Sequence, residues 1–383
     1  MRIVRLANFV TANSGGLRTA LRELGAGYAA AGHESVLVVP GAAYSRESTE
    51  QGDVITLPGP VVPGTGGYRV LVNRPKLARL LERLAPDRLE VSDRSTLRWT
   101  GGWARRHGVG SVMVSHESLA GLLRMTHADW LPSDRIADRL NARTAGQYDR
   151  VVCTTSWAAA EFRRLDVSNV EQVPLGVDLS GFHPDRYDGG LRAEYAAAGE
   201  LLLVHCSRLS PEKCPERSLT AIAELRRRGV AARLVVAGSG PLEERMRQRV
   251  AEQELPVTFE GFIGDRDRLA GLLASADVAL APGPVETFGL AALEALASGT
   301  PVVASAESAL PEVVGEAGAA APGHGEAYAD AVLELMARPR QLRRRAARRR
   351  AERYTWQAAV HGFLRVHESI SDQSTREFAI PRS

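Results

Sequence analysis

Short apolar runs recur along the chain, and most of them end at a glycine, a serine or a charged residue. Runs of this length that are rich in valine, leucine and isoleucine predict buried strands, and the segments between them have the spacing of amphipathic helices. Strands that alternate with helices indicate an α/β protein with doubly wound sheets. The expected strands are 2–10, 35–39, 88–91, 111–114, 151–155, 201–206, 233–237, 257–260 and 276–281.

The strand and helix pattern occurs in two similar halves, which a polar stretch at 183–199 separates. Because a domain typically has ~100–200 residues, we expect one domain over 1–180 and a second over 190–353. An amphipathic helix at 355–370 is expected to follow the second domain. The polar tail, 371–383, is expected to be disordered.

Composition narrows the class of protein. The formal net charge of +3 argues against bulk binding of nucleic acid. No apolar run approaches the ~20 residues of a membrane-spanning helix, and residues 1–10 have the pattern of a strand rather than of a signal peptide. The three cysteines, Cys153, Cys206 and Cys214, have neither paired nor metal-binding spacing, and the first two lie in strand-like runs. Reduced thiols of this kind predict a cytosolic protein.

The stretch 281–301 contains a complete short helix. Thr287 is the predicted N-cap, and Gly299 the predicted left-handed residue after its end. Two carboxylates, Glu286 and Glu294, lie just before the helix and within it. The first-turn amides have no partner inside the helix and form an anion-binding end. These amides belong to Phe288, Gly289 and Leu290. A diphosphate could bind there between two sugar hydroxyl sites, and the alternative is an ordinary capped helix with two surface glutamates.

Polar residues also follow other expected strands, at the sheet edge where open α/β sheets bind their ligands. A glycine turn, Gly15-Gly16, comes after the first strand, and Arg208 and Lys213 come after the strand 201–206. These cations could neutralise a diphosphate without a metal, or they could be solvated surface charges. Lys76 and Lys213 are the only lysines in a sequence whose other basic residues are nearly all arginine, which favours a function for Lys213. By position alone, further candidates are Asp93, Arg94 and His116.

The segment from Glu286 to Glu294, with Phe-Gly-Leu inside it and Ser-Gly-Thr-Pro-Val-Val after it, resembles the C-terminal signature of retaining glycosyltransferases of family four. Further similarities extend from the N-terminus to about residue 365. In character the chain is similar to actinobacterial GDP-mannose-dependent mannosyltransferases of envelope glycolipid synthesis. The resemblance implies the GT-B architecture, in which two Rossmann-like domains face a cleft. The first domain would bind the acceptor, the second the nucleotide sugar, and the last helix would cross back onto the first.

The resemblance also implies roles for individual residues. Glu286 would bind hydroxyls of the donor sugar, Glu294 the ribose, and His116 the reacting sugar, so that His116 and Glu286 are the expected catalytic residues. Arg208 and Lys213 would bind the diphosphate. The other expected donor contacts are Gly15, Gly16, Phe262, Ile263, Phe288, Gly289 and Leu290. The expected acceptor contacts are Asn13, Arg18, Asp93 and Arg94.

Neither a metal nor a cofactor is expected. Asp265-Arg266-Asp267 imitates the metal-binding Asp-x-Asp of a different glycosyltransferase fold, but it precedes a helix as capping residues would. The acceptor is expected to be a lipid or glycolipid at the cytoplasmic face of the membrane. An apolar segment at 119–133 and nine arginines between Arg338 and Arg353 would favour peripheral contact with anionic lipid. The alternatives are an ordinary packed helix for the apolar segment and one solvated helix face for the arginines.

Several alternatives remain open at this point. Another nucleotide sugar and a small soluble acceptor, such as a polyol or a natural product, would use the same site. Glycine turns after strands also occur in NAD(P)-dependent oxidoreductases, although the three-glycine fingerprint is absent. A phosphorylase-like enzyme would carry pyridoxal phosphate on one of the two lysines. A non-catalytic module would bind the sugar nucleotide without transferring it.

Overall fold

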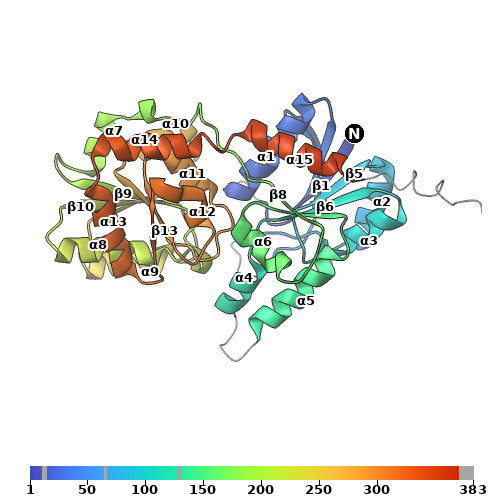
Figure 1. Cartoon of the computed structure of the whole chain (residues 1–383), viewed down its shortest axis with the longest axis horizontal. Helices are drawn as coiled ribbons and strands as arrows, with labels where there is room; N and C mark the ends of the chain where they lie inside the picture. Colours follow the sequence, from blue (N-terminus) through green and yellow to red (C-terminus); the bar gives the residue numbers. More distant parts are fainter. Residues whose placement is uncertain (11–14, 64–66, 127–131, 371–383) are drawn as a thin grey trace, which may run out of the picture. The chain divides into compact units, whose positions relative to one another are not determined.

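The computed structural model describes residues 1–10, 15–63, 67–126 and 132–370, with the side chains of 125 and 126 left out. The expected acceptor contact Asn13 and the tail 371–383 lie outside the described residues. The chain forms two compact units (Figure 1). Unit 1 comprises Met1–Pro174 and the segment from Trp356 onward, and unit 2 comprises Leu175–Thr355.

Unit 1 is built on an eight-stranded sheet of order β3-β4-β2-β1-β5-β6-β7-β8, in which only β3 runs antiparallel to its neighbour. Its strands are β1 (Arg2–Leu6), β2 (Glu34–Gly41), β3 (Ser45–Thr49), β4 (Gly52–Pro58), β5 (Arg88–Val91), β6 (Gly110–Ser115), β7 (Arg150–Cys153) and β8 (Val170–Gln172). Its helices are α1 (Gly16–Ala30), α2 (Arg74–Leu84), α3 (Trp99–Arg106), α4 (Leu119–Thr126), α5 (Ser133–Ala145), α6 (Ser156–Arg163) and α15 (Trp356–Glu368). The first strand ends at Leu6, earlier than expected, because Phe9 takes a left-handed backbone conformation with φ of 58°.

Helix α15 returns from the end of the chain to pack on α1 (Figure 1). Gly27 on α1 permits this approach, since a Cβ there would lie 2.2 Å from Cγ2 of Val360. At the far end of α15, His367 is fully buried, and its Nε2 lies 3.0 Å from Oε2 of Glu90 on β5. Tyr28 donates to the same carboxylate oxygen at 2.8 Å. The last helix is therefore part of the core of unit 1.

Unit 2 contains a six-stranded parallel sheet of order β11-β10-β9-β12-β13-β14. Its strands are β9 (Leu201–Cys206), β10 (Ala232–Ala237), β11 (Val257–Gly261), β12 (Val278–Ala281), β13 (Val302–Ser305) and β14 (Ala319–Ala321). Its α-helices are α7 (Gly189–Tyr195), α8 (Glu216–Arg227), α9 (Glu243–Glu252), α10 (Arg266–Ser275), α11 (Leu290–Ala297), α12 (Leu310–Val314), α13 (Gly325–Met336) and α14 (Arg340–Ala351). Short 3-10 turns are η1 (Pro184–Arg186), η2 (Pro211–Lys213) and η3 (Gly315–Ala317).

The helix of the 281–301 stretch starts later than predicted. Thr287 is buried in the preceding loop and is not the N-cap, so that prediction was wrong. Gly289 takes the position instead, with φ of 80°, and as a glycine it supplies no side-chain cap. The end of α11 is as predicted: Gly299 has φ of 79°, and the amides of Gly299 and Thr300 donate to Leu296 and Ala295. Asp265 caps α10 as expected, since its carboxylate accepts from two first-turn amides.

The arginine-rich helix α14 serves mainly to hold other helix ends. Arg344 donates to the carbonyl of Ala274 at 2.8 Å, Arg348 to that of Ala297 at 3.0 Å, and Arg350 to that of Val313 at 2.8 Å. Cations stabilise the C-terminal ends of helices, where carbonyl groups lack helical partners. The expectation of one solvated face therefore holds for only part of the run. In this run, the exposed arginines with no hydrogen bond or ion pair in the described ranges are Arg340, Arg345, Arg349 and Arg353, and Arg340 lies over the ring of Tyr187.

Candidate active site

In unit 2, four loops meet at the carboxyl ends of the strands. The loop after β9 lies against the glycine turn after β10, where a Cβ on Gly238 would lie 1.9 Å from the carbonyl oxygen of Ser207. The amide of Gly238 donates to the carbonyl of Gly261 at 2.7 Å. The loop before α11 lies against η2, since a Cβ on Gly283 would lie 3.4 Å from Cα of Lys213. Close backbone approach at glycines thus assembles this edge.

Both cations of the loop after β9 are paired with carboxylates. Lys213 on η2 donates to Glu286, which precedes α11, and Arg208 donates to Glu212. Ser210 also donates to Glu212, at 2.6 Å. Burial raises the pKa of Glu212, but the hydrogen bonds from Ser210 and Arg208 outweigh it and hold this pKa below its ordinary value. The structure therefore joins two residues of the predicted set, Lys213 and Glu286, and adds Glu212, which had no sequence pattern to reveal it.

A buried histidine supports the same loop. His205, the next-to-last residue of β9, has no exposed surface. Its Nδ1 lies 3.0 Å from Oγ of Ser218 and its Nε2 lies 2.9 Å from Oγ of Ser207. Burial, with a smaller effect of the Lys213 charge, lowers the pKa of His205 to about 4, so the ring is neutral. His205 was not among the predicted site residues, although a histidine in an apolar strand run, two residues before Ser207, could have indicated it.

The backbone at the start of α11 requires a glycine. A Cβ on Gly289 would lie 2.2 Å from Cδ2 of Leu310, and the positive φ also favours glycine. Glu294 lies one turn into α11, near the end of β9. Burial, and next the Glu294 carboxylate, raise the pKa of Cys206 to about 12. After β11, Phe262 is 50% exposed.

In unit 1, His116 lies immediately after β6. Its Nε2 is 3.2 Å from Oγ of Ser92, which follows the neighbouring strand β5. Burial lowers the pKa of His116 to about 4, and the charge of Arg94 acts in the same direction while Glu90 opposes it. The imidazole is thus neutral near pH 7. It can donate or accept a hydrogen bond but cannot act as a cation.

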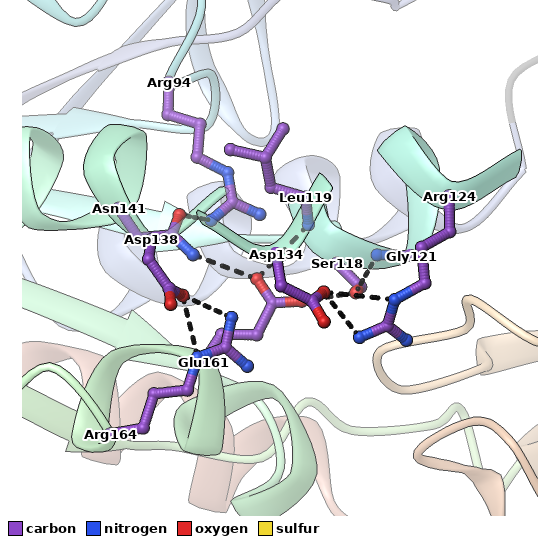
Figure 2. Close-up of polar contacts among 10 residues, drawn as sticks. All are labelled: Arg94, Ser118, Leu119, Gly121, Arg124, Asp134, Asp138, Asn141, Glu161 and Arg164. Carbon is purple, nitrogen blue, oxygen red and sulfur yellow. Dashed lines mark hydrogen bonds and ion pairs between the residues drawn. The ribbon is translucent and has the colours of Figure 1, made fainter. Parts of the chain in front are cut away.

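The expected acceptor residues of unit 1 have different surroundings. Asp93 is buried, and its carboxylate accepts from the Ser95 hydroxyl at 2.6 Å and from the Leu97 amide at 3.0 Å. It therefore holds its own loop, a role that the sequence did not predict. Arg18 is exposed on the first turn of α1, next to Gly15, where a Cβ would meet nothing within 4 Å. Arg94 joins a network that includes Asn141 and Glu161 (Figure 2).

Two family models match this chain. "Glycosyltransferase Family 4" matches residues 14–180, and "Glycosyl transferases group 1" matches residues 191–353. With the close relative described below, these matches show that the chain belongs to glycosyltransferase family 4. It is a glycosyltransferase of GT-B architecture, as the resemblance implied. Family membership favours this class over the oxidoreductase and the pyridoxal phosphate enzyme.

Individual relatives extend the similarity. A GDP-mannose-dependent alpha-(1-6)-phosphatidylinositol dimannoside mannosyltransferase of Mycobacterium tuberculosis is 53% identical over 370 residues, which are 95% of each chain. A D-inositol 3-phosphate glycosyltransferase of Saccharomonospora viridis is 34% identical over 70% of this chain and 66% of that protein.

Solved structures share the fold at lower identity. Sucrose-phosphate synthase from Thermosynechococcus elongatus aligns with a TM-score of 0.77 and 22% identity, covering 96% of this chain and 98% of that one. HepE of Anabaena, in complex with UDP and glucose, aligns with a TM-score of 0.74 and 16% identity, covering 97% and 100%.

Proposed function

We propose that this enzyme transfers mannose from GDP-mannose to a mannosylated phosphatidylinositol, with retention of the anomeric configuration. The observation that carries the proposal is the 53% identity, over 95% of both chains, to a mannosyltransferase named for that donor and lipid. The paired cations and the glycine N-cap of α11 in unit 2 suit a nucleoside diphosphate. Unit 2 is accordingly the donor domain and unit 1 the acceptor domain.

The donor would bind along the edge of the unit 2 sheet. Its diphosphate would replace the carboxylates as the partner of Arg208 and Lys213 and would accept from the first amides of α11. Glu286, released from Lys213, would then accept hydrogen bonds from sugar hydroxyls, and Glu294 would accept from the ribose. The backbone at Phe262 and Ile263 would contact the base.

The chemistry follows from where charge develops. When the bond between the anomeric carbon and the phosphate oxygen breaks, negative charge grows on the leaving diphosphate, and nearby cations stabilise it. The acceptor oxygen bonds to the same face of the anomeric carbon, and its proton passes to a leaving phosphate oxygen. Neutral His116 would hydrogen-bond to the reacting sugar. We propose that the reaction needs no metal, because Arg208 and Lys213 supply the positive charge.

Two features of the chain favour a lipid acceptor. Helix α4 contributes apolar residues in unit 1. Arg345, Arg349 and Arg353 form an exposed stripe at intervals of four residues, the first two on α14 and the third just after its end. Each basic residue near an anionic surface adds about 1 kcal/mol, so we propose reversible, peripheral contact with the cytoplasmic face of the membrane. No helix in the described part of the chain has the length and apolarity needed to cross a bilayer.

A soluble acceptor is the second candidate. The 34% identical relative is named for D-inositol 3-phosphate, a small polyol phosphate. Such an acceptor would need no membrane contact, and the arginine stripe on α14 would then be a solvated surface.

One transfer assay separates these proposals. Purified enzyme is given GDP-mannose with either phosphatidylinositol dimannoside in anionic vesicles or inositol 3-phosphate in solution, with and without EDTA. We expect an α-linked mannolipid, the same rate in EDTA, and vesicle sedimentation that salt weakens. Transfer to the polyol alone would establish the soluble acceptor, and metal dependence would overturn the charge assignment. Calorimetric binding of GDP-mannose with neither transfer nor hydrolysis would indicate a binding module.

A further inference from the structure

The short segment between β6 and α4 is clamped from both sides. It follows His116 directly, so its position sets the position of that ring. Arg94 donates to the carbonyl oxygen of Glu117. On the other side, the Glu161 carboxylate accepts from the hydroxyl of Ser118 and, at 3.3 Å, from the amide of Leu119 (Figure 2).

The same segment begins helix α4. The Ser118 hydroxyl oxygen accepts from the amide of Gly121 at 2.9 Å, which is the geometry of an N-cap, while its hydrogen is donated to Glu161. Glu161 therefore sets the start of α4 as well as the end of the His116 loop. Ser118 and Glu161 are buried, so water does not replace these bonds.

Asn141 on α5 joins the two clamps. Its Oδ1 accepts from Nη1 of Arg94 at 2.8 Å, and its Nδ2 donates to Oε2 of Glu161 at 3.1 Å. Asn141 has no exposed surface. The orientation of its amide follows from its partners, because one side must accept from a cation and the other must donate to a carboxylate. An ionised aspartate could satisfy the first contact but not the second, because it has no hydrogen to donate.

We propose that Arg94, Asn141 and Glu161 are positioning residues, which together hold His116 and the start of α4 in the arrangement used for transfer. The proposal rests on the function proposed above for its catalytic part. It changes the role expected of Arg94: the guanidinium binds a loop carbonyl and an amide, and lies 5.7 Å from the centre of the Phe162 ring. Arg94 thus supports the site from within unit 1 instead of contacting the acceptor.

Asn141→Asp tests the network with almost no change in shape. The new carboxylate keeps the bond to Arg94 but faces the Glu161 carboxylate, and two such groups must share a proton. Neighbouring ionisable groups include Arg94, Arg163, Cys153 and His116. Burial sets the pKa of Cys153 at about 12 and that of His116 at about 4, so neither titrates between pH 6 and 8.

We expect Asn141→Asp to lower kcat at least tenfold at pH 7.5, to leave KM for GDP-mannose within twofold, and to regain activity towards pH 6. Asn141→Leu should lose activity without this recovery. Asp138→Asn is the matched control: it lies on the same helix, and its partner Arg164 is exposed at the rim of the network, so activity should stay within twofold (Figure 2).

A second readout does not depend on mannose transfer. The imidazole NMR signals of His116, identified by their loss in His116→Gln, should shift in Asn141→Asp at pH 7.5 and return towards their wild-type positions at pH 6. Asp138→Asn should leave them unchanged. A wild-type enzyme that transfers no mannose would contradict the proposed function, yet these signals would still decide the positioning role.

Two results would overturn the inference. One is a folded Asn141→Asp enzyme with wild-type kcat and unshifted His116 signals. The other concerns Arg94→Lys, which keeps the charge but loses the planar fork. We expect it to lower kcat and to shift the His116 signals. A higher KM for the acceptor with unshifted signals would instead make Arg94 an acceptor contact. If Asn141→Asp does not fold, Arg94→Lys alone decides.

Discussion

The two sheet edges use their cations in opposite ways. In unit 2, Lys213 and Arg208 each pair directly with one carboxylate, and all four side chains are between 21% and 39% exposed. In unit 1, Arg94 reaches the carboxylate of Glu161 only through the buried amide of Asn141. A partly exposed ion pair contributes ~0–1 kcal/mol, whereas breaking a buried network leaves polar groups unpaired at a larger cost.

Under the proposed function, the sheet edge of unit 2 would exchange its carboxylates for a diphosphate, whereas the edge of unit 1 would position His116. The carboxylates of unit 2 pair with the cations, and under the proposed function a diphosphate would replace them at little cost. In unit 1 the polar side chains of the network bond to one another and to the loop after His116, and we propose that they hold neutral His116 in one position.

The largest expected effect concerns Lys213. Lys213→Ala removes a charge that would face the leaving diphosphate, and it should raise the barrier to transfer by roughly 2–4 kcal/mol. Lys76→Ala is the matched control, because Lys76 lies in the exposed first turn of α2 and is the other lysine of the chain. Steady-state kinetics should show a large loss of kcat/KM only for Lys213→Ala. Equal turnover in both variants would show that Lys213 does not stabilise the leaving diphosphate.

The two carboxylates of the α11 region should separate binding from turnover. Glu294→Ala should weaken the binding of GDP by roughly 1.5–3 kcal/mol, the scale of hydrogen bonds to a charged group. Glu286→Ala should spare GDP and lower turnover, because its partner would be the sugar. Calorimetry with GDP and kinetics with GDP-mannose measure the two effects. Equal loss of GDP affinity in both variants would contradict the placement of this pair along the donor.

Both sheet edges contain a histidine whose pKa burial lowers, His116 in unit 1 and His205 in unit 2. Such histidines predict a pH dependence of stability. Burial lowers the pKa of His205 to about 4, below the ~6.5 expected in the unfolded chain. The unfolded state therefore binds more protons between these values, and stability is lost as the pH falls from 6.5 to 4. From pH 7 to pH 5, His205 should account for about 2 kcal/mol of unfolding free energy. Urea unfolding of His205→Asn should show a flatter pH profile, and an unchanged profile would contradict the neutral state.

The glycines that begin α1 and α11 should differ in their tolerance of a side chain. Gly289→Ala imposes a left-handed conformation on alanine, which costs about 1–2 kcal/mol, and its Cβ also meets Leu310. Gly15→Ala should cost less, because Gly15 has φ of −77° and open space around its Cβ position. Thermal unfolding compares the two variants. A larger loss of Tm in Gly15→Ala would show that the loop of unit 1 is the more constrained.

Much of the architecture was predictable because it is local. Apolar runs that end in glycine or polar residues predicted most strands, and Gly299 and Asp265 marked helix ends through their own backbone and side-chain chemistry. Lys213 stood out because nearly every other basic residue is an arginine. The start of α11 was misjudged because Thr287 and Gly289 are both good N-caps, and the packing of Gly289 on Leu310 decides between them.

The sequence by itself determined the alternation of strands and helices, since side-chain periodicity and turn residues act over a few positions. It also placed the candidate residues at strand ends. Only the tertiary structure decided their partners: Lys213 meets Glu286 across 73 residues, and Arg94 meets Asn141 across 47. It also assigned arginines of α14 to the ends of other helices. Such pairings depend on which loops close and which backbones approach, and no local pattern of residues encodes that geometry.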